Sequence, residues 1–110
     1  MGDFKDDSHF QRAVRDVLDS LVDQLDELDV GSFELRNSPG SLIVEYDDGS
    51  ILMLSQQTPM HELWLSSNFT AWHFLCSSGS WVERDSAKPM VEVLSSQLSG
   101  RLGASVSLEL

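Results

Sequence analysis

The sequence is poor in cysteine and in basic residues, with one Cys and seven Lys and Arg against 18 Asp and Glu. A single cysteine, Cys76, excludes an internal disulfide and a zinc site built from several thiolates. The formal net charge of −11 leaves no basic surface for phosphate binding, so no nucleic-acid partner is expected. Suitable partners are cations or a basic protein surface.

Motifs of common enzymes and targeting segments are also absent. There is no nucleophile elbow, no phosphate-binding glycine loop and no HExxH zinc pattern. His9, His61 and His73 lie far apart, which argues against a closed metal site. The opening MGDFKDD has neither an apolar signal core nor an Arg-rich presequence character. We therefore expect a protein that stays where it is made, without a membrane-spanning segment.

The composition is that of a folded soluble protein, with 41% hydrophobic and 23% charged residues. No internal repeat, linker or low-complexity segment interrupts it. A chain of 110 residues can bury one core, so we expect a single domain over residues 1–110.

The stretch from Phe10 to Asp29 has the period of a helix that ends at a Gly stop, Gly31. Apolar residues spaced three and four apart form one stripe that requires a core. Carboxylates at the same spacing fall on the opposite side, within an arc of roughly 100°. The apolar stripe is Val14, Leu18, Leu21, Val22, Leu25 and Leu28, and the acidic side is Asp16, Asp19, Asp23, Asp26 and Glu27.

Repulsion between like charges weakens such a helix by a few tenths of a kcal/mol per pair. Arg12 and Arg15 are spaced to pair with Asp16 and Asp19, which would partly neutralise the first half. Composition alone leaves a solvated face and a functional ridge equally open. Carboxylates splayed on a convex helix would bind hard cations weakly, at several places and open to water.

After this helix the period changes from 3.6 to 2. We expect about six short strands with hairpin-length connections, which predicts an antiparallel meander. Pro89 and Gly103 bound a second amphipathic helix, and the tail from Ala104 is expected to be extended and packed. The fold class is α+β, a two-layer sandwich with both helices on one face of the sheet. The predicted strands are 33–36, 42–46, 51–55, 62–66, 72–76 and 81–83.

Four further residues invite an interpretation. Alternation places Trp64 on the solvent side of the sheet if Leu63 and Leu65 face the core; an exposed tryptophan there marks an interface unless it packs on Trp72 or Trp81. His73 is expected on the face opposite its neighbours, His61 in an exposed loop, and Cys76 as a buried small apolar residue.

The segment QTPMHELWLSS, followed by the WHF of residues 72–74 and the SWV of residues 80–82, resembles the frataxin family. The likeness covers roughly Phe10 to Leu108, and within the family the sequence resembles the bacterial, CyaY-type branch. Three positions differ from the family pattern: this chain has Ser55 and Glu62 where Asn and Gln are common, and Ala71 stands about where eukaryotic members carry a basic residue.

The resemblance implies a non-enzymatic, iron-binding regulator of iron–sulfur cluster assembly, an iron chaperone that holds Fe²⁺ or Fe³⁺ weakly on an acidic ridge. Its partners would be the cysteine desulfurase and scaffold, in a bacterial cytoplasm, and it would be a monomer or an oligomer formed with iron. The alternatives are an acidic interaction module with incidental metal binding, or a ferroxidase or iron-storage protein. The implied metal residues are Asp19, Asp23, Asp26, Glu27, Asp29 and Glu34, and the implied partner-binding residues are Asp23, Asp26, Glu27, Gln57, Pro59 and Trp64.

Overall fold

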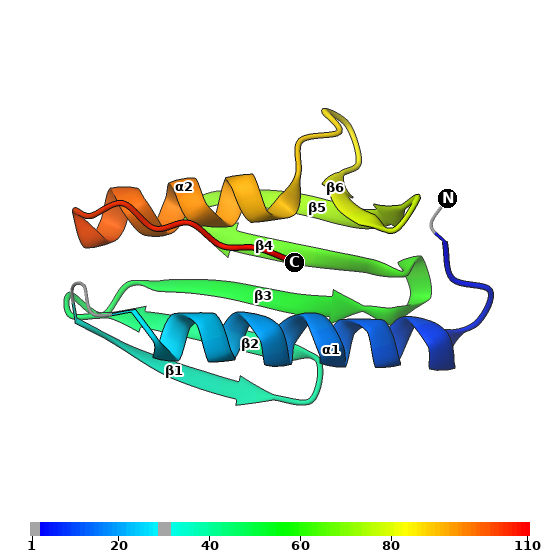
Figure 1. Ribbon diagram of the computed structural model, residues 1–110, viewed down its shortest axis with the longest axis horizontal. Coiled ribbons are helices and arrows are strands. Elements are labelled where there is room, and N and C mark those ends of the chain that lie inside the picture. Colours follow the sequence, from blue (N-terminus) through cyan, green and yellow to red (C-terminus); the bar gives the residue numbers. More distant parts are fainter. Residues whose placement is uncertain (1–2, 29–31) are drawn as a thin grey trace.

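The computed structural model, which describes residues 3–28 and 32–110, has two helices and six strands over that part of the chain (Figure 1). This confirms the predicted α+β sandwich. The elements are α1 (Asp7–Asp26), β1 (Phe33–Ser38), β2 (Ser41–Tyr46), β3 (Ile51–Gln57), the 3₁₀ turn η1 (Thr58–Met60), β4 (Glu62–Ser67), β5 (Thr70–Ser77), β6 (Ser80–Glu83) and α2 (Met90–Leu102).

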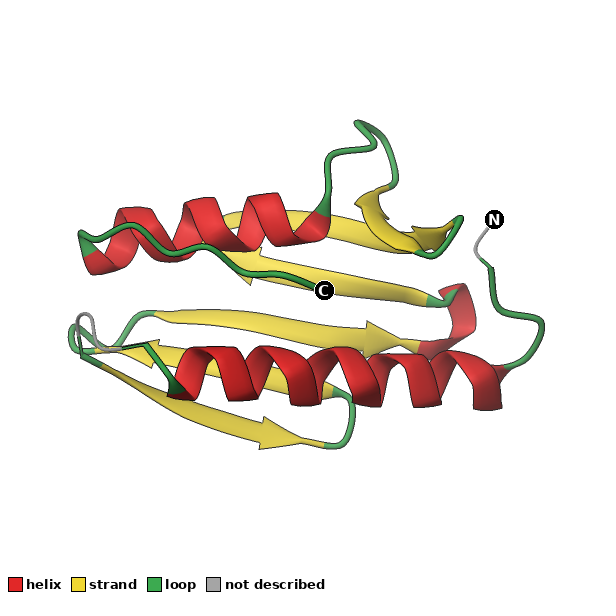
Figure 2. Cartoon of the chain, viewed as in Figure 1, coloured by secondary structure: helices red, strands yellow, loops and turns green. Residues whose placement is uncertain are grey.

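The strands form one antiparallel sheet in the order β1-β2-β3-β4-β5-β6. Each strand pairs with its neighbour in the chain, as short hairpins require. Both helices cover the same face of this sheet, side by side (Figure 2). The opposite face, which we call the outer sheet face, carries no covering element in the described part of the chain.

Helix α1 begins and ends about three residues before the predicted bounds. Asp6 is the N-cap, and its Oδ1 accepts a hydrogen bond from the His9 backbone N–H at 2.8 Å. At the other end the Leu28 N–H donates to the Leu25 carbonyl at 3.1 Å, an i to i−3 bond typical of a tightened last turn. The predicted stop, Gly31, lies outside the described residues.

The core lies between the helices and the inner face of the sheet. Burial alternates along β2, where Leu42, Val44 and Tyr46 are buried and the residues between them are half-buried. The helix stripe predicted from the sequence supplies the other side, with Val22 and Leu28 only partly buried at its edge. The buried helical residues are Phe10, Val14, Leu18, Leu21 and Leu25 from α1, and Met90, Val93, Leu94 and Leu98 from α2.

The C-terminal tail is extended and packed, as predicted, with Val106 and Leu108 buried. It runs back between the two helices (Figure 1). The Leu108 N–H donates to the Ser95 hydroxyl of α2 at 3.0 Å. On the α1 side, the Gln24 amide accepts from the Glu109 N–H at 2.9 Å and donates to its carbonyl. The tail therefore ties α1 to α2 along the surface of the core.

The β2–β3 hairpin is tied to α2 by Asp48, whose carboxylate contacts Arg101 at 2.7 Å. Hydrogen bonds from the Ser50 hydroxyl and backbone N–H, together with Arg101, lower the pKa of Asp48 from 3.8 to about 2. Because the folded-state pKa is depressed, the stabilisation is complete above about pH 4 and is lost as the pH falls through about 2.

We therefore expect the difference in unfolding free energy between the wild type and Asp48→Asn to shrink as the pH falls from about 4 to about 2. Urea unfolding at a series of pH values measures it. Asp47→Asn, at the exposed neighbouring position, is the control. A difference that stays constant over this range would show that the Asp48 contacts do not stabilise the ionised form.

Candidate functional site

The outward side of α1 exposes a row of carboxylates that we call the acidic face. Its residues Asp16, Asp19, Asp23, Asp26 and Glu27 are exposed. None of them makes an ion pair within 4 Å among the residues that the structure describes. The apolar stripe forces this orientation, because burying Leu18, Leu21 and Leu25 turns the carboxylates to solvent.

The predicted ion pairs of Arg12 with Asp16 and of Arg15 with Asp19 are wrong. Neither contact is formed, although all four residues belong to α1 and are described. Exposed pairs of this spacing contribute only about 0.3–0.5 kcal/mol, which the entropy of two long side chains offsets. No basic side chain in the described part of the chain therefore neutralises the acidic face by direct contact.

The remaining residues of the predicted ridge are not gathered on this face. Glu34 pairs with Glu45 in the β1–β2 register and belongs to the outer sheet face, since its neighbours Phe33 and Leu35 pack against the core. Asp29 lies outside the described residues. Within residues 3–28 and 32–110, no three His, Cys, Asp or Glu side chains converge on one metal position. The donors suit several open contacts rather than one cage.

The outer sheet face carries Trp64, as alternation predicted. Leu63 and Leu65 on either side of it are buried, while Trp64 is only half-buried. Register places Ser55 and His73 directly beside it on the two neighbouring strands, and Gln57 beside Glu62. Pro59 is exposed in η1, just beyond the end of β3. Gln57, Pro59 and Trp64 thus lie on and beside one solvent-facing surface.

Glu62 is buried on this same face, with 5% of its surface exposed. One of its carboxylate oxygens accepts from the Trp64 indole N–H at 2.9 Å, and Arg84 donates to both oxygens at 3.2 and 3.5 Å. Arg84 is in turn anchored by its backbone N–H, which donates to the His73 carbonyl at 2.9 Å. The buried charge is thereby paired and hydrogen-bonded, and the indole of Trp64 is held in one orientation.

Trp64 packs on the His73 ring, with 4.5 Å between centroids, and not on Trp72 or Trp81. The alternative partners are excluded by register. Trp72 lies opposite Leu65 and Trp81 opposite Cys76, so both belong to the core face. The position of His73, away from its neighbours Trp72 and Phe74, is as predicted.

The expectation of an exposed loop for His61 is wrong. Its ring is half-buried and stacks on Phe10 at 4.9 Å, while Nε2 lies 2.8 Å from the Asp7 carboxylate. His61 is half-buried because of a tertiary contact: η1 places its side chain against the first turn of α1. His61 therefore joins the two elements and is not available as an open ligand.

Cys76 is buried, in agreement with its interpretation as a small apolar residue. Burial, helped by the Asp3 carboxylate 3.5 Å from Sγ, raises the pKa of Cys76 to about 11. The thiolate, which is the nucleophilic form, is therefore disfavoured at neutral pH.

Sequence reasoning missed the pairing of Glu62 with Arg84. The two residues are 22 positions apart, on β4 and beyond the end of β6, and strand β5 lies between these strands in the sheet. A carboxylate at the first position of an apolar strand is the one local signal, and it does not identify the partner. Only the order of the strands in the sheet brings Arg84 close to Glu62, across strand β5.

A frataxin from Psychromonas ingrahamii has the same fold, with a TM-score of 0.87 over 96% of this chain and 99% of that chain at 18% identity. The architecture is thus that of the frataxin class of α+β proteins. A family model described as a frataxin-like domain matches residues 3–104. The chain belongs to the frataxin family.

Two relatives carry the name iron-sulfur cluster assembly protein CyaY. The protein from Neisseria meningitidis serogroup C is 29% identical over 94% of this chain and 95% of the relative. The protein from Ralstonia nicotianae is 34% identical over 76% of this chain and 73% of the relative. Neither helix of the described chain has the length and apolar character needed to cross a membrane.

Proposed function

We propose that this chain is a regulator of iron–sulfur cluster assembly that holds Fe²⁺ or Fe³⁺ weakly on the acidic face and docks on the cysteine desulfurase and its scaffold. The observation that carries the proposal is the exposure of five unpaired carboxylates along one side of α1. Membership of the frataxin family and the names of the relatives support it.

Iron is the cargo in this proposal. Carboxylate oxygens are hard ligands suited to iron, and neighbouring side chains on one helix face allow an ion to be bound by one or two of them with water completing its shell. Asp19, Asp23, Asp26 and Glu27 would serve in this way; Asp29, which lies outside the described residues, is included on the family resemblance. Glu34 would bind separately, since it lies on the outer sheet face.

The negative electrostatic field of these carboxylates also supports docking on a partner protein. A net charge of −11 draws a basic protein surface toward the chain and accelerates association. Asp23, Asp26 and Glu27 would face a basic groove of the desulfurase, so that iron and the partner compete for one set of carboxylates. Gln57 and Trp64 on the outer sheet face, with Pro59 beside it in η1, would form a second contact, toward the scaffold.

An anaerobic Fe²⁺ titration of ¹⁵N-labelled protein tests the iron part. We expect broadening of the amides from Asp19 to Glu27 and, separately, of the amides beside Glu34, because paramagnetic broadening falls steeply with distance from the ion. In Asp23→Asn/Asp26→Asn the broadening should be much reduced at equal iron concentration. Asp47→Asn/Asp85→Asn, which removes two exposed carboxylates elsewhere, should leave it unchanged.

Broadening centred on His61 or His73, or none at all, would contradict iron binding on α1. Competition with Mg²⁺ separates the second candidate, an interaction module whose metal binding is incidental. In residues 3–28 and 32–110 no three metal-donor side chains converge on one position, and this observation favours the second candidate and makes the test necessary. Complete displacement of iron by millimolar Mg²⁺ would support it, and retention of iron would support the cargo role.

A further inference from the structure

Two arginines of this acidic chain are left without a carboxylate partner. Of the five arginines, three bind one at 2.6–3.2 Å, namely Arg36 with Glu45, Arg84 with Glu62 and Arg101 with Asp48. Arg12 and Arg15 contact no carboxylate within 4 Å in the described residues, although Asp16 and Asp19 follow them at the i, i+4 spacing of helical ion pairs. Both guanidinium groups are therefore available to a ligand.

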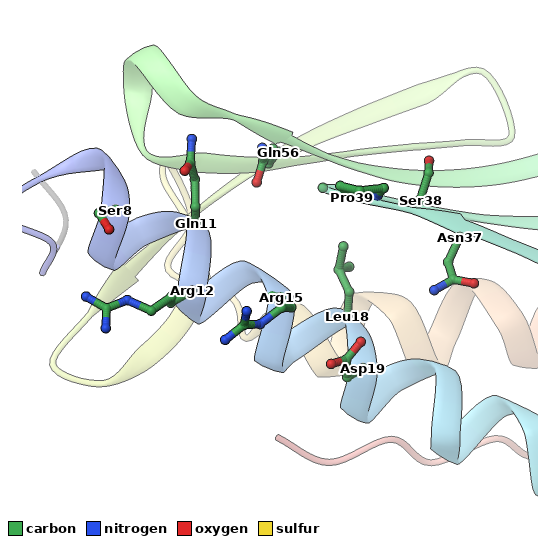
Figure 3. Close-up of a pocket in the computed structure, with 11 residues that line it drawn as sticks. Ser8, Gln11, Arg12, Arg15, Leu18, Asp19, Asn37, Ser38, Pro39 and Gln56 are labelled. Carbon is green, nitrogen blue, oxygen red and sulfur yellow. The ribbon is translucent and has the colours of Figure 1, made fainter.

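Both arginines line one pocket of about 680 Å³ between α1 and the β1–β2 turn. Figure 3 shows them projecting from the same side of the helix, with Gln56, Pro39 and Ser38 across the opening. This volume lies within the range of small-molecule sites. Its polar lining is rich in hydrogen-bond donors: besides Arg12 and Arg15 it contains Ser8 and Gln11 of α1, Asn37 and Ser38 of β1, and Gln56 of β3.

The far wall of the pocket is built by a close contact at the β1–β2 turn. Gly40 has φ +79°, and a Cβ at this position would lie 2.5 Å from the Gln56 side chain. The Gln56 N–H also donates to the Gly40 carbonyl at 2.8 Å. The glycine thus lets the turn pack against Gln56, which places the side-chain amide in the wall opposite the helix.

The donor set matches carboxylates. A guanidinium presents two parallel N–H donors to one carboxylate. Two guanidinium groups three residues apart on a helix can therefore each bind a different carboxylate of the same ligand. Amide and hydroxyl groups on the opposite wall suit the remaining oxygens. We propose that this pocket binds a small di- or tricarboxylate anion, one carboxylate on each arginine. The proposal does not depend on the iron-related function.

Asp19 also lines the pocket, at the end nearest the acidic face. Its charge opposes an anion there, so the ligand must lie toward Arg12, Gln11 and Gln56 at the other end (Figure 3). The strongly negative chain adds a general repulsion. Binding therefore requires both guanidinium groups, and losing them should have a large effect.

Titration of metal-free ¹⁵N-labelled protein with citrate, at constant ionic strength, tests the proposal. We expect shifts in the amides of residues 11–19, 37–40 and 56. In Arg12→Gln/Arg15→Gln the affinity should fall about tenfold or more, because two charge-assisted contacts are lost. Glutamine is a good helix former, so α1 should be retained, and circular dichroism checks this.

A control matched in charge is Lys5→Gln/Lys88→Gln, which removes the same positive charge at exposed sites outside the pocket. Its citrate affinity should stay within about twofold of wild type, since screening weakens distant exposed charges. Equal weakening of both variants, or shifts elsewhere, would overturn the site. Acetate or inorganic phosphate binding as tightly as citrate would overturn the ligand class.

Discussion

Replacing Asp23 and Asp26 together by lysine is expected to weaken binding to a bacterial cysteine desulfurase about a hundredfold at low ionic strength. Each carboxylate in close contact with a basic partner contributes at least about 1.5 kcal/mol of coupling, and two such losses correspond to roughly two orders of magnitude. Both side chains are exposed and unpaired, so the fold should tolerate the change. Titration calorimetry or surface plasmon resonance gives the affinity.

The control is Asp47→Lys/Asp85→Lys, which alters the net charge equally at exposed sites away from α1. It should lower affinity much less, through the general field alone. Wild-type binding should also weaken with added salt more steeply than binding of the α1 variant. If both double variants lose affinity equally, the docking face is not on α1.

Replacing Arg84 by methionine is expected to lower the free energy of unfolding by about 2 kcal/mol. The substitution leaves the Glu62 carboxylate, 5% exposed, without its cationic partner. Breaking a buried pair on one side costs about 3–5 kcal/mol, and we reduce this because the Arg84 side chain is 34% exposed and screened by water. Urea unfolding at pH 7 measures the loss.

The double variant Glu62→Gln/Arg84→Met should recover most of this stability, because no charge then remains buried without a partner. The glutamine oxygen can still accept from the Trp64 indole N–H, so the indole ¹H–¹⁵N signal should stay close to its wild-type position in Glu62→Gln. A double-mutant cycle isolates the coupling of the pair. A loss below about 0.5 kcal/mol in Arg84→Met would mean that water already solvates Glu62. A full loss with no recovery in the double variant would mean that the Arg84 side chain stabilises the fold through its packing and not by pairing with Glu62.

Local patterns predicted the fold because most of its contacts are local. Every strand pairs with its neighbour in the chain, so hairpin signals such as Asp48-Gly49 determine both partners and direction. The burial of Leu63 and Leu65 with Trp64 turned outward follows from a period of two. The bounds of α1 were less accurate, because its N-cap Asp6 lies in a polar lead-in without periodicity.

The acidic face could be predicted for the same reason. Helical geometry alone puts Asp19, Asp23 and Asp26 on one side of α1 once the apolar stripe is buried. The position of Glu34 could not be predicted, since it depends on which sheet face the helices cover. Whether Arg12 and Arg15 would pair with neighbouring carboxylates was also undetermined, because exposed pairs are close to neutral in free energy.

The sequence by itself determined the elements, their order, the two sides of α1 and the resemblance to frataxins, all of which rest on period, turn chemistry and short motifs. Only the tertiary structure decided which distant groups meet. It joined Glu62 to Arg84, packed the His73 ring on Trp64, and placed the β1–β2 turn across a pocket from Arg12 and Arg15. These contacts depend on strand register and on how a helix packs over a sheet, and such long-range packing leaves no local pattern in the chain.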